Sequence, residues 1–145
     1  MTRPLKIAFV KARWHANIVD QTQIGFEAEM KKHGRECQLN EIHAPGALEM
    51  PLIAKKLAET GKYDGVVCAA LVVNGGIYRH EFVAQAVVDG LVRASLDTGV
   101  PVYSVSLTPH EFQESPDHIA FYTKHFVKKG AEAANAVLAM DALDI

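Results

Sequence analysis

Two short segments of the chain contain residue types that can bind an anion and transfer protons. The first is His-Ala-Pro-Gly-Ala-Leu-Glu-Met-Pro, at 43–51, and the second is Val-Val-Asn-Gly-Gly-Ile-Tyr-Arg-His-Glu-Phe, at 72–82. Each follows a strand-like run, turns on glycine or proline and leads into a helical pattern. Backbone amides at such a turn can bind phosphate. Arg79 adds a permanent positive charge, and His80 exchanges protons near neutral pH. This pattern predicts a site for an anionic substrate that needs proton transfer.

Each of these residues also has a purely structural explanation. Paired glycines can simply make a tight turn, and Arg79 and His80 can be surface residues at a helix start. The helix dipole alone favours a carboxylate at Glu49. Trp14, the sole tryptophan, would ordinarily be a core residue, but it follows the first strand in a loop where an indole can stack on a flat heterocycle. The common position of these residues at one edge of the predicted sheet favours the functional interpretation.

The elements that must position these residues alternate along the chain. Strands are predicted at 5–10, 37–43, 65–73 and 102–107, and helices at 18–32, 48–61, 80–98 and 118–143. Asn17 and Asp20 are expected to cap the first helix and to give it an acidic first turn. Repeated strand–helix units with short links predict an α/β fold of flavodoxin-like type, a three-layer α/β/α sandwich around a four-stranded parallel sheet. In such a sheet ligands bind at the carboxyl ends of the strands, where the two motifs lie.

Small residues are frequent in the last helix. They are Ala131, Ala133, Ala134, Ala136 and Ala139. We expect them to allow close packing within one subunit, because cores commonly use alanine. Contact between subunits is the alternative explanation.

Length and composition limit the classes of function. The 145 residues are expected to form one domain, 1–145, and the formal net charge of −2 gives no general attraction to nucleic acid or anionic lipid. No secretory signal or membrane-spanning run is visible, so we expect a cytoplasmic protein without a membrane partner. Cys37 and Cys68 are too few and too far apart for a disulfide framework, and Cys68 is predicted to lie in the core.

Several motifs that carry cofactors or nucleophiles are absent from the sequence. It contains no GxGxxG turn, no P-loop, no CxxC pair and no GxSxG elbow. His80-Glu81 and His110-Glu111 begin like a zinc-binding helix motif, but Ala84 and Glu114 occupy the positions of the second histidine. We therefore expect no metal and no covalent nucleophile from the protein. The substrate would supply the nucleophile, and the protein would supply positioning, proton transfer and charge stabilisation.

Five segments together resemble the lumazine synthase family, enzymes of riboflavin biosynthesis. They are 13–15, 44–51, 72–78, 101–108 and 129–134, and the resemblance spans nearly the whole chain. It implies a cofactor-free condensation of 5-amino-6-(D-ribitylamino)uracil with 3,4-dihydroxy-2-butanone 4-phosphate. The product is 6,7-dimethyl-8-ribityllumazine, and phosphate and water are released.

The resemblance assigns roles around the heterocycle and the phosphate. It implies that Trp14 stacks on the pyrimidine ring and that Val72 and Val73 flank the heterocycle. The amides of Gly76 and Ile77 would bind the phosphate. His80 and Arg79 are the candidate catalytic residues.

The resemblance also assigns roles along the ribityl chain and across a subunit boundary. Ala47, Leu48 and Glu49 would bind the ribityl chain, with Glu49 accepting hydrogen bonds from its hydroxyl groups. Ser104 would line the pocket from the neighbouring subunit. Lys129 matches a lysine directed at the pyrimidine carbonyl.

Two departures from the family pattern leave roles open. Most members place a catalytic histidine where this chain has Arg79, and His80 follows one residue later, a rotation of about 100° on a helix. Either His80 reaches the site from an altered helix start, or Arg79 acts electrostatically. The usual phosphate-binding arginine before the last helix is also missing, and Lys124, His118, His125 or Arg79 could substitute for it.

The resemblance further implies an assembly. Sites of this family lie between the subunits of a pentamer, and the Tyr-Arg-His sequence resembles a second branch that forms decamers of two stacked pentamers. The expected partners are thus two small-molecule substrates and other copies of the chain. A low-turnover protein that binds ribityllumazine or flavin on the same fold is the alternative function, and a flavodoxin-like scaffold is a third.

Overall fold

The computed structural model describes residues 3–73, 79–109 and 115–145. Its apolar, β-branched runs form the strands β1 (Leu5–Ala12), β2 (Cys37–Ala44), β3 (Gly65–Leu71) and β4 (Val102–Leu107). They pair in parallel in the order β2-β1-β3-β4. Every residue of β3 is buried, which explains why its sequence is apolar without alternation.

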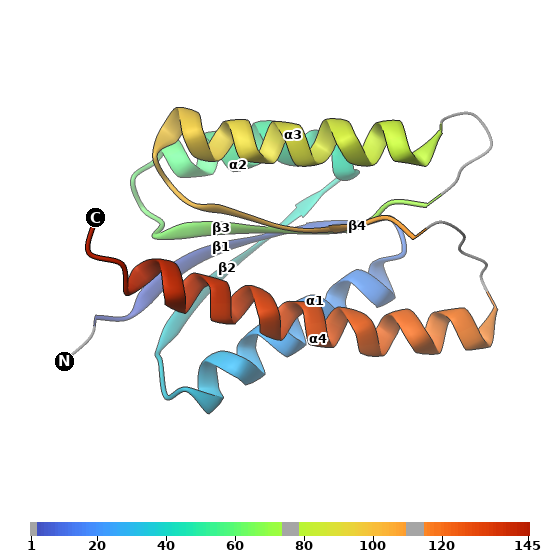
Figure 1. Cartoon of the computed structure of the whole chain (residues 1–145), viewed down its shortest axis with the longest axis horizontal. Helices are drawn as coiled ribbons and strands as arrows, with labels where there is room; N and C mark the ends of the chain where they lie inside the picture. The colour runs from blue at the N-terminus through green and yellow to red at the C-terminus, as the bar shows by residue number, and fades with distance from the viewer. Residues whose placement is uncertain (1–2, 74–78, 110–114) are drawn as a thin grey trace.

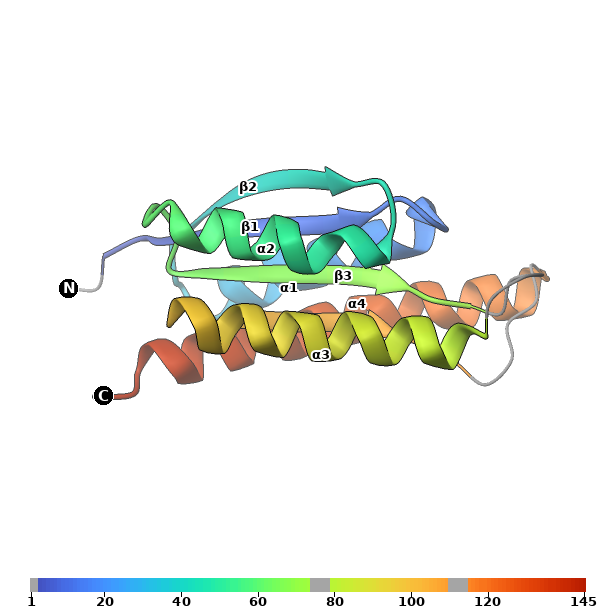
Figure 2. The same ribbon diagram turned by 90° about the horizontal axis from the view of Figure 1, so that it is seen from above.

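Helices cover both faces of this sheet (Figure 1). On one face lie α1 (Ala16–Lys32) and α4 (Pro116–Asp141), and on the other lie α2 (Met50–Glu59) and α3 (His80–Thr98). Alternate side chains of β1 enter separate cores, with Phe9 facing the α1 side and Val10 facing the α2 side. Figure 2 shows β2, β1 and β3 side by side in that order. The predicted three-layer sandwich around a four-stranded parallel sheet is confirmed.

Small residues bring α1 and α4 into close contact. A side-chain carbon added at Gly25 or at Gly130 would collide with a backbone carbonyl oxygen of the facing helix. Ala133 and Ala134 of α4 are buried in the same core, whereas Ala136 is exposed. Close packing within the chain therefore accounts for part of the predicted small-residue surface.

The predicted start of α1 is wrong. Its N-cap is His15 in a left-handed conformation, with φ of 52°, and the first turn contains no acidic residue. Asp20 bonds to Arg13 instead, so its carboxylate ties the helix to the preceding turn. Asn17 does not cap the helix, and Asp20 lies beyond its first turn, so both expectations are wrong.

Other boundaries differ by a few residues. The predicted helix at 48–61 begins as a short 3-10 helix, η1 (Ala47–Glu49), before α2. The last helix begins earlier than expected because Ser115 caps it, accepting a hydrogen bond from the His118 amide at 3.3 Å. Cys68 is fully buried, as predicted. Within the residues that the structure describes, no helix is both long enough and apolar enough to cross a membrane.

Candidate functional site

A pocket of about 240 Å³ lies where β1 and β3 end and α3 begins. It is lined by Trp14, His15, Leu71, Val72, Val73, His80 and Val83. The walls are mostly apolar, with one indole and two imidazoles. The topology explains this grouping, because β1 and β3 are adjacent parallel strands whose carboxyl ends meet at one edge of the sheet. The structure thus brings four predicted site residues together: Trp14, Val72, Val73 and His80.

The start of α3 places His80 and Arg79 in different surroundings. The His80 side chain is only 16% exposed, lines the pocket and has its Nδ1 atom 3.3 Å from a carboxylate oxygen of Glu81. Arg79 is 72% exposed, and its guanidinium lies over the ring of Phe82 and 3.6 Å from Glu81. With its proton on Nδ1, facing the carboxylate, the His80 ring would offer Nε2 to a substrate.

Trp14 is also in contact with the second predicted motif. The indole lies against Gly46, where an added Cβ would be 2.6 Å from Cζ2 of the ring and 3.1 Å from the Glu49 carboxylate. The turn after β1 and the turn after β2 therefore meet at Gly46. In η1, Ala47 is buried and Leu48 is half-exposed. The prediction that Trp14 and Glu49 share one edge of the sheet agrees with this arrangement.

The remaining predicted residues do not line this pocket. Ser104 is exposed on the edge strand β4, where its hydroxyl accepts a hydrogen bond from the Ser106 amide at 3.3 Å. Lys129 lies on α4 and forms an ion pair of 2.9 Å with Glu132. Gly76 and Ile77 lie outside the described residues.

The candidates for a phosphate-binding cation on α4 also lie outside the pocket lining. His118 packs edge-on against Tyr122, with ring centroids 6.3 Å apart. His125 stacks on Phe121 with ring centroids 5.7 Å apart. Lys124 is exposed on the same helix.

Sequence reasoning missed a group of charges beside the Trp14 turn. Lys11 at the end of β1 is buried, and its ammonium contacts Glu41 of β2 at 2.6 Å and Asp20 of α1 at 3.1 Å. Arg13 binds both oxygens of Asp20, at 2.9 and 3.1 Å. Glu41 also contacts His43 at 2.8 Å. A lysine that extends the apolar run of β1 was the available signal for such a group.

These contacts shift the pKa values of both carboxyl groups. Hydrogen bonds from His43 and then Lys11 lower the pKa of Glu41 to about 2. Partial burial alone would raise the pKa of Asp20, but the hydrogen bonds from Arg13 and Lys11 outweigh it, and the pKa is lowered. Both groups are therefore held in the charged form.

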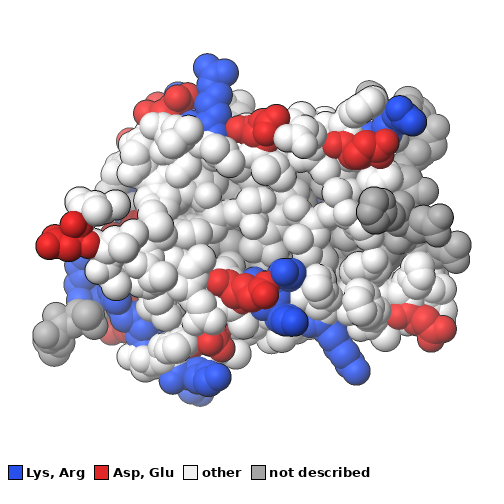
Figure 3. Space-filling model, in the orientation of Figure 1, with Lys and Arg blue, Asp and Glu red and all other residues white. Residues whose placement is uncertain are grey.

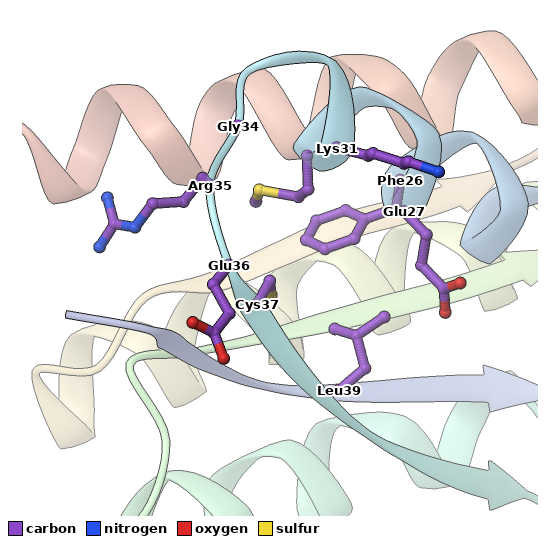
Figure 4. Close-up of a pocket in the computed structure, with 9 residues that line it drawn as sticks. Phe26, Glu27, Lys31, Gly34, Arg35, Glu36, Cys37 and Leu39 are labelled. Carbon is purple, nitrogen blue, oxygen red and sulfur yellow. The ribbon is translucent and has the colours of Figure 1, made fainter. Parts of the chain in front are cut away.

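A larger hollow, of about 670 Å³, lies at the amino end of β2 (Figure 4). Phe26, Met30 and Leu39 form its apolar part, with the carboxylates of Glu27 and Glu36 at the margin. None of the predicted site residues lines it. It lies at the end of the sheet opposite to the one where parallel α/β sheets bind ligands, so its volume alone does not make it the candidate site.

Metal donors are not gathered in the described part of the chain. Among those residues, no group of three His, Cys, Asp or Glu side chains could hold a metal ion. His80 and Glu81 lack a second histidine, because Ala84 occupies that position. The pair His110-Glu111 lies outside the described residues.

Comparison with known proteins matches nearly the whole chain to one enzyme family. The family model for 6,7-dimethyl-8-ribityllumazine synthase matches residues 4–144. A protein of Rhodococcus erythropolis with that name is 54% identical over 133 residues, covering 91% of this chain and 86% of its relative. A protein named 6,7-dimethyl-8-ribityllumazine synthase 2, from Pseudomonas syringae pv. tomato, is 55% identical over 130 residues, covering 89% and 76%. Another of that name, from Bradyrhizobium diazoefficiens, is 44% identical over 135 residues, covering 92% and 81%.

Proposed function

The chain belongs to the 6,7-dimethyl-8-ribityllumazine synthase family and is a lumazine synthase of riboflavin biosynthesis, and we propose that its pocket between Trp14 and His80 binds the pyrimidine substrate. The observation that carries this proposal is the joint lining of one mostly apolar pocket by an indole and an imidazole. The indole can stack on a flat heterocycle, and the imidazole can transfer protons.

In the proposed reaction the substrate amine condenses with the ketone of the butanone phosphate and releases one water, phosphate is then eliminated, and ring closure releases a second water. Trp14 stacks on the pyrimidine, and Val72 and Val73 flank it. His80 moves protons through Nε2 during the condensation and the ring closure. The nucleophile comes from the substrate, so the protein contributes positioning and proton transfer.

The proposal assigns the rest of each substrate to neighbouring segments. Ala47, Leu48 and Glu49 bind the ribityl chain. Support for this comes from the contact of Trp14 and Glu49 with the same glycine, Gly46, which places η1 next to the stacking residue. The assignment of phosphate to the amides of Gly76 and Ile77 rests on the motif alone.

We further propose that a second copy of the chain completes the site with Ser104 and Lys129. On the face that carries β4, the area between α3 and α4 is largely free of charged atoms, which lie along the helices and around the margin (Figure 3). Exposed apolar side chains of α3 and α4 include Phe82, Leu96 and Phe121. A pentamer, doubled into a decamer, would bury such surface. Light scattering should give the mass of five or ten chains, and a stable monomer with full activity would contradict the shared site.

A spectrophotometric assay with both substrates tests the proposed function. The expected result is formation of 6,7-dimethyl-8-ribityllumazine above the uncatalysed background, with loss of that rate in Trp14→Ala and His80→Ala. Binding should be measured as well, because Arg79 occupies the position at which most members of the family have the catalytic histidine. Tight binding of the ribityl pyrimidine without turnover would favour the alternative function, a low-turnover binding protein.

A further inference from the structure

The end of β1 holds a buried lysine. Lys11 is 4% exposed and pairs with Ala69 of β3 and His43 of β2 in the sheet register. Its ammonium contacts Glu41 at 2.6 Å and Asp20 at 3.1 Å. One buried cation thus connects three elements, β1, β2 and α1, at the edge of the sheet where the pocket opens.

The residues on either side of Trp14 are held in place by contacts with this charged group and by the backbone. Arg13, the residue before Trp14, binds both oxygens of Asp20, and its amide donates to the Ala44 carbonyl at 3.2 Å. His15, the residue after it, has a left-handed backbone conformation with φ of 52°. Such a conformation is uncommon for a residue with a side chain, and it persists where the surrounding contacts determine it.

Fold stability alone does not explain the lysine at position 11. Removing an ammonium from water costs several kcal/mol, and an apolar side chain of similar volume in such a position is often as stable or more so. Both carboxylate partners are partly solvated, with side-chain exposures of 39% for Asp20 and 42% for Glu41. Each also has a second hydrogen-bonding neighbour, Arg13 for Asp20 and His43 for Glu41. Without Lys11 each carboxylate would therefore keep a partner and its contact with water, but the bridge between Asp20 of α1 and Glu41 of β2 would be lost.

We propose that Lys11 is a positioning residue for Trp14. Through Asp20 and Glu41 it fixes the 13–15 turn relative to β2 and α1, and so holds the indole in the orientation that accepts the pyrimidine. This inference rests on the proposed function in one respect, namely that Trp14 stacks on that ring. It assigns Lys11 a role in substrate affinity and no contact with the reacting atoms.

The experiment uses Lys11→Met in the assembled enzyme, with Lys55→Met as the matched control. Lys55 lies on α2 in an exposed ion pair with Glu59, at 2.9 Å, so its loss should have little effect. Because Trp14 is the sole tryptophan, its fluorescence reports the turn without any substrate. We expect Lys11→Met to change the emission maximum and increase acrylamide quenching. The KM for the ribityl pyrimidine should rise roughly tenfold, with kcat changed less than about threefold and the urea midpoint nearly unchanged.

Each outcome supports or overturns the proposal. Unchanged fluorescence and unchanged KM in a folded Lys11→Met protein would overturn it. A parallel fall of kcat and of the urea midpoint would also overturn it, since that is the effect of a purely structural residue. Altered fluorescence with unchanged KM would overturn the link between Lys11 and substrate affinity. The KM of Trp14→Ala then shows which of the two proposals has failed. If Trp14→Ala also leaves KM unchanged, the stacking role in the proposed function has failed. If it raises KM, only the role of Lys11 has failed.

A second variant keeps the test available if Lys11→Met does not fold. Glu41→Gln removes one partner charge from the partly exposed β2 position and retains the side-chain shape. The same fluorescence change and a smaller rise in KM are expected. A folded Glu41→Gln protein with neither change would overturn the proposal.

Discussion

The indole of Trp14 packs directly on the backbone of Gly46, so closely that a methyl group there would be 2.6 Å from the ring atom Cζ2. Gly46 has an extended backbone, with φ of −153°, which alanine can adopt without strain. A substitution at this position therefore acts through the indole and through Glu49, whose carboxylate would be 3.1 Å away.

We expect Gly46→Ala to displace Trp14 and to raise the KM for the ribityl pyrimidine, roughly tenfold, with little change in the urea midpoint. Steady-state kinetics at saturating butanone phosphate and the fluorescence of Trp14 measure the two effects. Ala136→Ser, on an exposed position of α4, serves as a control for a small added group. Unaltered KM and fluorescence in Gly46→Ala would show that the contact does not position the ring.

His80→Ala should lower kcat by about 10²-fold with little change in affinity for the ribityl pyrimidine, because His80 lines the pocket and can transfer protons.

Arg79→Ala should instead raise the KM for the phosphate substrate, about tenfold, if its exposed guanidinium binds phosphate. Arg93→Ala, an exposed arginine of the same helix paired with Asp97, is the matched control. A large loss of kcat in Arg79→Ala with none in His80→Ala would reverse the two assignments.

Acid should destabilise the protein partly through Glu41 and Asp20. Both carboxyl groups have a lower pKa in the folded chain than the ordinary values of 4.5 and 3.8, and that of Glu41 falls to about 2. Their contribution is present above the ordinary pKa and is lost as the pH falls toward the folded pKa. The urea midpoint should therefore fall from about pH 5 downward, and less steeply in Glu41→Gln. Glu59→Gln, in an exposed pair, should retain the wild-type slope.

Gly130→Ala should destabilise the fold by about 1–3 kcal/mol, because its methyl group would collide with the Thr22 carbonyl oxygen and force α1 and α4 apart. Urea unfolding measures this change. Ala136→Ser on the exposed side of α4 should change the unfolding free energy by less than about 0.5 kcal/mol. An equally small change in Gly130→Ala would mean that the two helices separate easily.

The sequence predicted the bounds of helices and strands well where glycine or proline ends them. The bounds of α3 and β4 agree with the prediction, since Gly99 ends the helix in a left-handed conformation, with φ of 73°, and Pro101 precedes the strand. The apolar run at 5–10 predicted that β1 ends at Val10. The strand continues to Ala12 because Asp20 and Glu41, from remote segments, neutralise that lysine. The predicted acidic first turn fails for another reason, because α1 begins at Ala16 and Asp20 therefore lies beyond its first turn.

The pocket was predictable to the extent that strand order determines it. Trp14 and His80 follow β1 and β3, and adjacent parallel strands place their carboxyl ends together. Sequence alone left open whether His80 or Arg79 faces the pocket, since this depends on the residue at which α3 begins. The roles of Ser104 and Lys129 remain predictions, because they require a second copy of the chain.

The first and last described segments are tied together at the amino end of the sheet (Figure 1). Arg35 binds the Asp141 carboxylate at 3.0 Å and the Arg3 carbonyl at 2.9 Å, and Arg3 binds Asp64 at 2.8 Å. The pocket opens at the opposite end, where β1 and β3 finish. A tag, surface anchor or displayed cargo attached beyond either segment would extend away from the pocket, so the protein can be immobilised from this side while substrate access is retained.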